Sequence, residues 1–256
     1  MSKTIVVTGS SAGIGRAVTE LLLARGDAVI GLDRSESTDL DLARFIPVDL
    51  GDDQSIDEAI AAIENPIDGL CNVAGVSGIG GADLTMRVNY LGLRALTLGL
   101  ADRMKRGSSV VNVASIAGAQ WLPRKEQHLA LARTNSFDNG LKWLADNPVA
   151  DEDGYPYSKE ALRVWTRFQA TEWLSSGIRM NCVNPGPVNT GLRSEFLESL
   201  GTERVQDDIN RVGRDGTAPD IAPLIAWLTT DESTWINGSD IPADGGLAAS
   251  FLGDLL

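Results

Sequence analysis

A tyrosine and a lysine four residues apart give the clearest chemical signal in this 256-residue chain. Tyr155 and Lys159 stand in the run Tyr-Pro-Tyr-Ser-Lys, and a spacing of four places both side chains on one face of a helix. Oxidation of an alcohol needs a base for the hydroxyl proton, but an unperturbed tyrosine pKa near 10 is too high for this work at neutral pH. Because a nearby ammonium favours tyrosinate, we expect Lys159 to lower the pKa of Tyr155.

The motif is short, and alone it also fits an ordinary tyrosine and lysine on an amphipathic helix. Tyr157 competes with Tyr155 as the base, but it lacks the four-residue spacing to Lys159. We expect Tyr157 to face elsewhere and to pack.

Three glycines, Gly9, Gly13 and Gly15, follow the first apolar run. Where a strand turns into a helix, glycine permits a tight turn and a close approach of a pyrophosphate to the N-terminus of the helix. The cluster also fits a plain turn before a helix. The next apolar run ends in Asp33, whose carboxylate would bind an adenosine ribose and repel a 2′-phosphate, so NAD is favoured over NADP. Arg34 keeps NADP open as the alternative, because a guanidinium could neutralise that phosphate.

The elements that must position these residues alternate along the chain. Short β-branched runs predict strands, and apolar residues at three-to-four spacing predict helices between them. This alternation predicts an α/β fold: a single-domain, Rossmann-like, doubly wound parallel sheet of about seven strands. The strands are expected at 4–8, 28–33, 45–48, 67–72, 110–114, 178–183 and 240–243. The helices are expected at 13–25, 55–64, 84–104, 155–176 and 219–229, with a capping box at Ser55 and Glu58 and with Pro219 in a first turn.

Together, the glycine spacing and the Tyr155–Lys159 motif resemble the short-chain dehydrogenase/reductase family, and the resemblance covers nearly the whole chain. It implies that Tyr155 is the catalytic base and that Lys159 also binds the nicotinamide ribose. It implies further that Ser115 orients the substrate oxygen and that Asn89 holds a water in a proton relay. The cofactor-binding residues that it implies are Gly9, Ser11, Gly13, Ile14, Gly15, Asp33, Arg34, Asp49, Leu50, Asn72, Ala74, Gly75, Tyr155, Lys159, Pro185, Gly186, Val188 and Thr190.

Ser115 and Tyr155 are 40 residues apart, more than in most members of the family. The extra stretch, 119–154, carries helical patterns near 126–132 and 137–145, and its apolar residues either pack locally or line the substrate pocket. The chain thereby resembles the subgroup of 3α-hydroxysteroid dehydrogenase/carbonyl reductase and coniferyl-alcohol dehydrogenase, in which the insertion covers a surface used for tetramer assembly. A homodimer is therefore expected. The segment 191–215 is expected to be a mobile lid over the substrate.

Composition argues against several other partners. A net charge of -13 and a pI near 4.5 would repel nucleic acid and anionic lipid. No apolar run approaches the roughly 20 residues of a membrane span, so we expect no membrane partner and a cytoplasmic location. Cys71 and Cys182 lie in apolar runs and are expected to be reduced and structural. His128 is the only histidine and is expected to lie at the surface or in helix packing, and no metal is expected.

The sequence thus predicts an NAD-dependent oxidoreductase that transfers a hydride between nicotinamide and a secondary alcohol or ketone. A steroid, aromatic or alicyclic substrate is expected. A cofactor-independent dehalogenase on the same fold is one alternative, against which the glycines and Asp33 count. A dinucleotide-binding scaffold or redox sensor is the other, against which the joint presence of Tyr155, Lys159 and Ser115 counts. The fold alone would not separate these functions.

Overall fold

A computed structural model of the chain describes residues 2–253. Its centre is a seven-stranded parallel sheet in the order β3-β2-β1-β4-β5-β6-β9, which confirms the predicted architecture. The order reverses between β1 and β4, and in open sheets of this kind ligands bind outside the carboxyl ends of the strands at such a reversal. The strands are β1 (Thr4–Thr8), β2 (Ala28–Asp33), β3 (Arg44–Pro47), β4 (Ile67–Asn72), β5 (Met104–Val113), β6 (Arg179–Pro185) and β9 (Asp240–Ala243).

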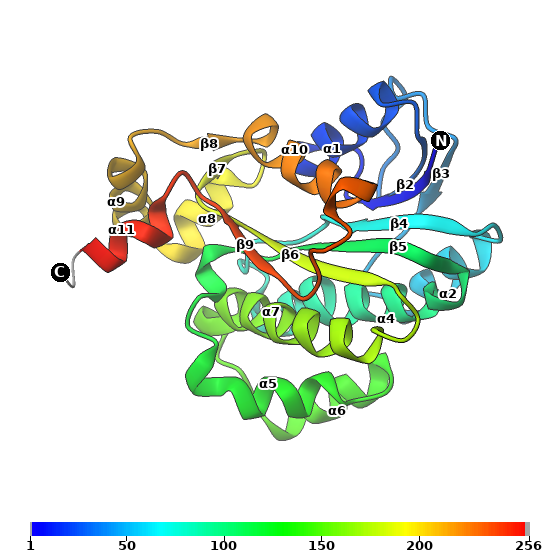
Figure 1. Ribbon diagram of the computed structural model, residues 1–256. Helices are drawn as coiled ribbons and strands as arrows, with labels where there is room; N and C mark the ends of the chain where they lie inside the picture. The colour runs from blue at the N-terminus through cyan, green and yellow to red at the C-terminus, as the bar shows by residue number, and fades with distance from the viewer. Residues whose placement is uncertain (1, 254–256) are drawn as a thin grey trace.

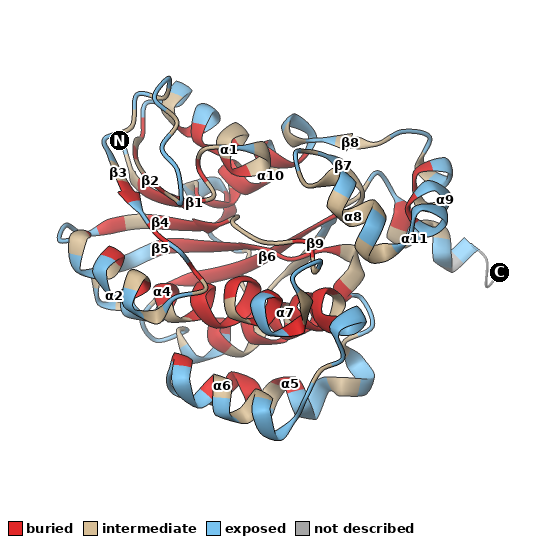
Figure 2. Cartoon of the chain, turned by 180° about the vertical axis from the view of Figure 1, so that it is seen from behind, coloured by how far each residue is buried: buried red, intermediate tan, exposed pale blue. Residues whose placement is uncertain are grey.

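Helices cover both faces of the sheet (Figure 1). On one face, α1 (Gly13–Ala24) packs beside α10 (Ala218–Leu228). On the other face lie α2 (Asp53–Ala62), α4 (Leu93–Gly99) and α7 (Gly154–Glu172). Side chains alternate along each strand, so the strands supply both layers, and Figure 2 shows the sheet and the inner side of α7 as buried. Among the described residues, no helix is both long and apolar enough to span a bilayer.

The insertion adds a helical layer outside α7 (Figures 1 and 2). Its helices α5 (Lys125–Ala132) and α6 (Phe137–Asp146) match the two predicted patterns, and α5 packs directly on α7. Arg94 of α4 is fully buried and donates to the carbonyls of Leu131 and Ser136 at 2.8 and 3.0 Å. These bonds fasten the end of α5 and the start of α6 to the main body.

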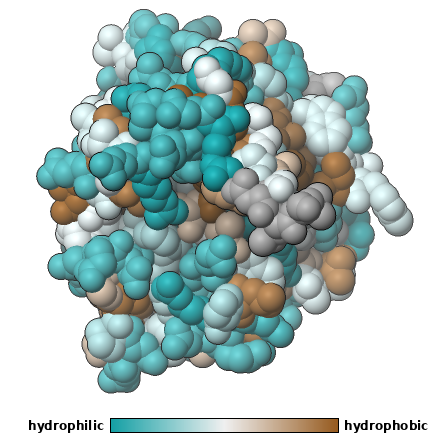
Figure 3. Space-filling model, turned by 90° about the vertical axis from the view of Figure 1, so that its left-hand side faces the viewer, coloured by the Kyte–Doolittle hydropathy of each residue, from teal (hydrophilic) through white to brown (hydrophobic). Residues whose placement is uncertain are grey.

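The segment 191–215 folds as two helices at the carboxyl edge of the sheet, α8 (Arg193–Leu200) and α9 (Thr202–Val212). A two-stranded ladder of β7 (Val188–Asn189) with β8 (Gly216–Thr217) joins its two ends, and α11 (Leu247–Gly253) packs on α9. Figure 3 shows that this side of the molecule is mostly hydrophilic, with hydrophobic residues scattered among polar ones. The apolar side of α9 faces inward instead, where Val205 and Ile209 are buried.

The prediction of a single helix at 84–104 is wrong. The stretch is divided into α3 (Gly81–Met86), a π-helical turn (Arg87–Gly92), α4 and a short 3-10 turn, and β5 already begins at Met104. Gly92 in the π-helical turn lies so close to the loop after β3 that a Cβ there would be 1.9 Å from the Leu50 carbonyl oxygen. Apolar spacing continues through the break, so it gives no sign of this tertiary contact.

The capping box expected at Ser55 and Glu58 is also wrong, because α2 begins two residues earlier than expected. The Asp52 side chain caps α2 by accepting from the Gln54 N–H at 3.1 Å. The Ser55 hydroxyl instead accepts from the backbone N–H of Asp49 at 2.9 Å. Serine and aspartate are both good caps, so local sequence alone did not separate the two possible starts.

Candidate active site

The loop between β1 and α1 is a glycine turn that larger residues could not form. Gly9 and Gly13 have φ angles of 69° and 54°, in the left-handed region that favours glycine. A Cβ on Gly15 would lie 2.0 Å from the carbonyl oxygen of Gly9, so α1 can begin this close to β1 only with glycine there. The first turn of α1 carries no acidic residue, which leaves its backbone N–H groups suited to an anion.

Asp33 lies at the end of β2, beside this turn. Its carboxylate accepts from the backbone N–H groups of Ser11 at 3.0 Å and of Arg34 at 2.7 Å. The negative charge is therefore held at a fixed place, whereas the Arg34 side chain extends from an exposed residue. This arrangement offers acceptors to ribose hydroxyls and opposes a second phosphate.

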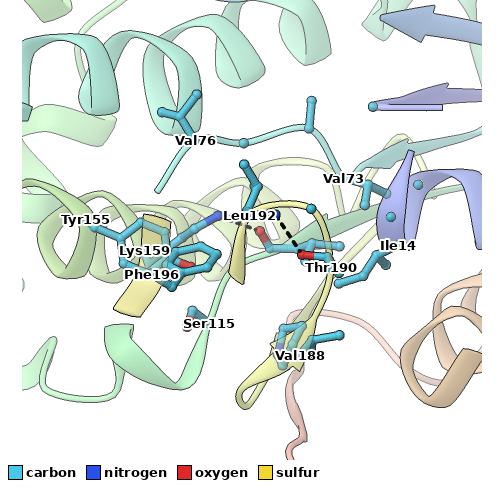
Figure 4. A pocket seen from close by; sticks show the side chains of 18 of the residues that line it. Ile14, Val73, Val76, Ser115, Tyr155, Lys159, Val188, Thr190, Leu192 and Phe196 are labelled. Atoms are coloured by element: carbon cyan, nitrogen blue, oxygen red, sulfur yellow. Dashed lines mark hydrogen bonds between the residues drawn. The ribbon is translucent and has the colours of Figure 1, made fainter. Parts of the chain in front are cut away.

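A cavity of about 450 Å³ connects the glycine turn with Tyr155 (Figure 4). Its walls come from the carboxyl ends of the central strands and from the segment 191–215. The predicted site residues that line it are Gly9, Gly13, Ile14, Gly15, Asp33, Arg34, Asp49, Leu50, Ala74, Gly75, Ser115, Tyr155, Lys159, Pro185, Gly186, Val188 and Thr190.

Ser11 and Asn72 were also predicted to bind cofactor, but neither lies in the cavity lining. Ser11 holds Asp33 through its backbone N–H. Asn72 is fully buried behind the cavity, where its amide donates to Thr97 and Asn112, both at 2.9 Å. Both residues hold the wall in place, and the motif alone did not reveal that the Asn72 side chain turns into the core.

Asn89 lies in the π-helical turn and likewise does not line the cavity. Its amide accepts from the Val76 N–H at 2.8 Å and donates to the Val76 carbonyl at 3.0 Å and to the Ser158 hydroxyl at 3.3 Å. The Ser158 hydroxyl in turn donates to the carbonyl of Tyr155 at 2.8 Å. Asn89 thus joins the loop after β4 to the start of α7, and its part in a proton relay stays a prediction.

Tyr155, Ser115 and Lys159 come together where α7 crosses the end of β5. Gly118, three residues after Ser115, lies directly on α7: a Cβ there would be 2.7 Å from the carbonyl carbon of Lys159. This close approach lets the Ser115 hydroxyl act as a hydrogen-bond partner that lowers the pKa of Tyr155. The Lys159 ammonium lies 5.6 Å from the centroid of the Tyr155 ring and donates to the Val113 carbonyl at 3.0 Å.

Comparison with known proteins agrees with this geometry. Residues 3–127 match a family model described as short chain dehydrogenase, and residues 143–248 match one described as enoyl-(acyl carrier protein) reductase. The chain is 46% identical over 252 residues to coniferyl-alcohol dehydrogenase of Pseudomonas sp. (strain HR199 / DSM 7063), with 98% of each chain covered. This chain belongs to the short-chain dehydrogenase/reductase family. It is therefore an enzyme of an oxidoreductase family, as the motifs predict.

Two further short-chain dehydrogenases/reductases are similar over almost their whole length. The 3-alpha-hydroxysteroid dehydrogenase/carbonyl reductase of Comamonas testosteroni is 28% identical over 256 residues, with 96% of each chain covered. A crystal structure of the 3-alpha-hydroxysteroid dehydrogenase from Pseudomonas sp. B-0831 complexed with NADH superposes with a TM-score of 0.81 at 30% identity. The match covers 97% of this chain and 98% of that one.

Burial dominates the electrostatics of this short-chain dehydrogenase/reductase. It raises the pKa of Tyr155 to about 12, and the hydrogen bond from Ser115 offsets only part of that rise. Burial also lowers the pKa of Lys159 to about 8. The expectation of a lowered pKa for Tyr155 is therefore wrong for the chain by itself, because burial of the phenol outweighs the group that favours tyrosinate.

Residues of α8 that the sequence did not assign close the cavity over Tyr155. The ring of Phe196 meets the Tyr155 ring edge-on, with 5.0 Å between the centroids. The buried Ser77 hydroxyl donates to the Glu195 carboxylate at 2.6 Å and fastens α8 to the loop after β4. Apolar residues inside a charged segment were the available sequence signal, but they did not show which side chain would reach the tyrosine.

The insertion supports α7 from behind, and none of the residues 119–154 lines the main cavity, although Asp151 and Glu152 line a second recess beside Tyr155. His128 is fully buried, 2.9 Å from the Glu160 carboxylate, and its ring packs on Tyr157 with 4.5 Å between the centroids. Arg124 lies 3.6 Å from the same carboxylate. Of the two places expected for His128, helix packing is the one observed, and Tyr157 packs away from the site as expected.

Proposed function

We propose that this enzyme is an NAD-dependent oxidoreductase that transfers a hydride between nicotinamide and a bulky, apolar alcohol or its carbonyl counterpart. The observation that carries the proposal is the position of Tyr155, Ser115 and Lys159 at one end of a cavity whose other end is the glycine turn with Asp33. The NADH complex of the 3-alpha-hydroxysteroid dehydrogenase, whose chain superposes over nearly its full length, supports the same cofactor class.

The residues present fit a nicotinamide dinucleotide. The N-terminus of α1 would bind the diphosphate through backbone N–H groups, because Gly13, Ile14 and Gly15 at that end line the cavity. Asp33 would accept hydrogen bonds from the adenosine ribose, and Lys159 would hold the nicotinamide ribose. The fixed charge of Asp33 favours NAD over NADP. Arg34 is the residue through which NADP would have to be accommodated.

Bound nicotinamide would supply the hydride acceptor or donor. Tyr155 would exchange the proton with the substrate oxygen, and Ser115, which is already its hydrogen-bond partner, would orient that oxygen. A raised pKa keeps Tyr155 protonated, which suits carbonyl reduction. Alcohol oxidation would need added positive charge beside Tyr155, which the oxidised nicotinamide ring would supply.

The lining near Tyr155 favours an uncharged, apolar substrate. Phe196, Leu192 and Ile116 line the cavity there. A second recess beside Tyr155 is lined by the carboxylates of Asp151, Glu152 and Glu198, which would repel an anionic substrate. Coniferyl alcohol, named for the relative at 46% identity, is an aromatic primary alcohol. Aromatic alcohols therefore come first among the aromatic, steroid and alicyclic candidates, and both primary alcohols and the secondary alcohols predicted from the sequence belong on the panel.

The test is a pair of variants assayed on a panel of such alcohols with NAD and NADP. Tyr155→Phe should abolish turnover and retain NADH binding, because phenylalanine cannot carry the proton. Tyr157→Phe is the matched control and should retain turnover, since its ring packs on His128. Full turnover by Tyr155→Phe would refute the catalytic assignment. Failure of the unaltered protein to bind NADH or NADPH would refute the oxidoreductase proposal and favour the dehalogenase or scaffold alternatives.

A further inference from the structure

An ion pair joins the two ends of the segment 191–215 at the cavity wall. Arg193 begins α8 and Asp215 directly precedes β8, and the Arg193 Nη2 lies 3.0 Å from the Asp215 Oδ2. Both residues line the cavity, and their side chains are 32% and 25% exposed. The ladder between Val188 and Gly216 already holds the two ends together. The ion pair is therefore not needed to close the base of the segment.

Arg193 has a hydrogen-bond donor to spare. Its Nε–H is buried and has no partner among residues 2–253. Leaving such a donor unpaired is unfavourable, and a guanidinium is built to give two parallel hydrogen bonds to one carboxylate or phosphate group. Asp215 engages Nη2, at 3.0 Å. A cavity-lining arginine with an unused Nε–H is suited to an anion that offers several oxygen acceptors.

Thr190 links Arg193 to the wall beside the α1 N-terminus. The Arg193 backbone N–H donates to the Thr190 carbonyl at 3.0 Å, and a Cβ on Gly13 would be 3.6 Å from the Thr190 Cβ. Figure 4 shows Thr190 beside Ile14, away from Tyr155.

Other cations in the described cavity lining lie elsewhere. Arg34 follows Asp33 at the end of β2, Lys159 lies at Tyr155, and Arg204 belongs to α9. Arg193 is thus the cationic residue of the described lining that is bonded to Thr190.

We propose that Arg193 binds the diphosphate of the dinucleotide and exchanges Asp215 for it when the cofactor enters. The inference rests on the proposed function, since the anion is that of a nicotinamide dinucleotide. A diphosphate carries two negative charges and several acceptor oxygens, so it can use both Nε and Nη2. Because Arg193 is the first residue of α8, the exchange couples cofactor binding to the position of the helix that carries Phe196 over Tyr155.

Two single variants distinguish diphosphate binding by Arg193 from a purely structural role of its ion pair with Asp215. Arg193→Gln should raise the Kd for NADH about ten- to a hundred-fold, as loss of a charge-assisted hydrogen bond does. Asp215→Asn should leave NADH binding unchanged or tighten it, because it frees Arg193. Any tightening should vanish in the double variant, which distinguishes release of Arg193 from general loss of a negative charge. Arg204→Gln, which removes a charge from the same lining, is the matched control and should change the Kd much less.

Fragments of the cofactor test whether Arg193 binds the diphosphate in particular. ADP-ribose, which keeps the diphosphate, should lose affinity for Arg193→Gln as NADH does, whereas adenosine should not. Fluorescence or calorimetric titration gives each Kd without turnover, and thermal unfolding checks that each variant is folded. An unchanged Kd in Arg193→Gln, or an equal loss in Asp215→Asn, would overturn the proposal and leave the proposed function standing. Absence of NADH and NADPH binding by the unaltered protein would overturn both.

Discussion

Tyrosine titration tests directly whether burial sets the pKa of Tyr155. The chain has three tyrosines, Tyr90, Tyr155 and Tyr157, and burial raises the pKa of each to about 12. For Tyr155, a rise of about two units above 10 favours the protonated phenol by roughly 3 kcal/mol. At about pH 10.5 an unperturbed tyrosine is about three-quarters ionised, whereas one with a pKa of about 12 is only about 3% ionised.

The assay is absorbance at the tyrosinate band of the native protein against the urea-unfolded protein. Native protein at about pH 10.5 should show almost no tyrosinate, and unfolded protein should show most of it. The sign for stability follows: a raised pKa stabilises the fold below the unfolded value near 10, and this contribution is lost as the pH rises through about 12. Unfolding free energy should therefore fall over that range.

One outcome would refute this reasoning. A tyrosine that ionises at or below about pH 10 in the native protein, and that disappears in Tyr155→Phe, would mean that burial does not raise the pKa of Tyr155. Addition of NAD provides a second test, because its positively charged nicotinamide beside Tyr155 should lower the pKa of Tyr155. One tyrosine's absorbance should then appear on adding NAD, and only in protein that retains Tyr155.

His128→Leu and Glu160→Leu each remove one partner of a buried hydrogen bond and should each cost about 2 kcal/mol of unfolding free energy in urea. The double variant should cost clearly less than their sum, and additive costs would contradict the pairing. Gly15→Val places a side chain on the Gly9 carbonyl and should abolish NADH binding by fluorescence; a folded variant of full affinity would contradict this. Asp33→Asn removes the charge that opposes a 2′-phosphate, so the affinity for NADPH relative to NADH should rise about ten-fold, and an unchanged ratio would remove Asp33 as the selector. Sedimentation should show a dimer, because α5 and α6 cover α7, and a tetramer would contradict that reasoning.

The parts of the fold that depend on local signals could be predicted from the sequence. Local sequence predicts the strands β1 and β2 from their β-branched runs, and it predicts the turn between β1 and α1 from its glycines. The glycines and Asp33 lie together in the lining of one cavity, as the sequence predicts. The Tyr155–Lys159 spacing likewise placed both side chains on the same side of α7.

What the sequence did not reveal depends on packing between distant segments. The π-helical turn places Asn89 against Val76, and Gly154 starts α7 where a Cβ would lie 2.7 Å from the Ala82 Cα. No local pattern reports either contact. The prediction of a lowered pKa for Tyr155 was wrong for the same reason. Sequence spacing identifies Lys159 as a neighbour, but it does not measure how deeply α8 buries Tyr155.

The β7–β8 ladder has a consequence for the order in which ligands bind. It holds both ends of the segment 191–215 at the cofactor wall, while Gly191 and Gly213 lie just inside those ends. No atom within 4 Å would obstruct a Cβ on either glycine, and Gly213 has a φ of 85°, so both are suited to act as hinges. We expect the helices to swing outward and admit or release substrate while Val188 and Thr190 stay in place. Cofactor would enter first and leave last, and product inhibition patterns would be those of an ordered sequence.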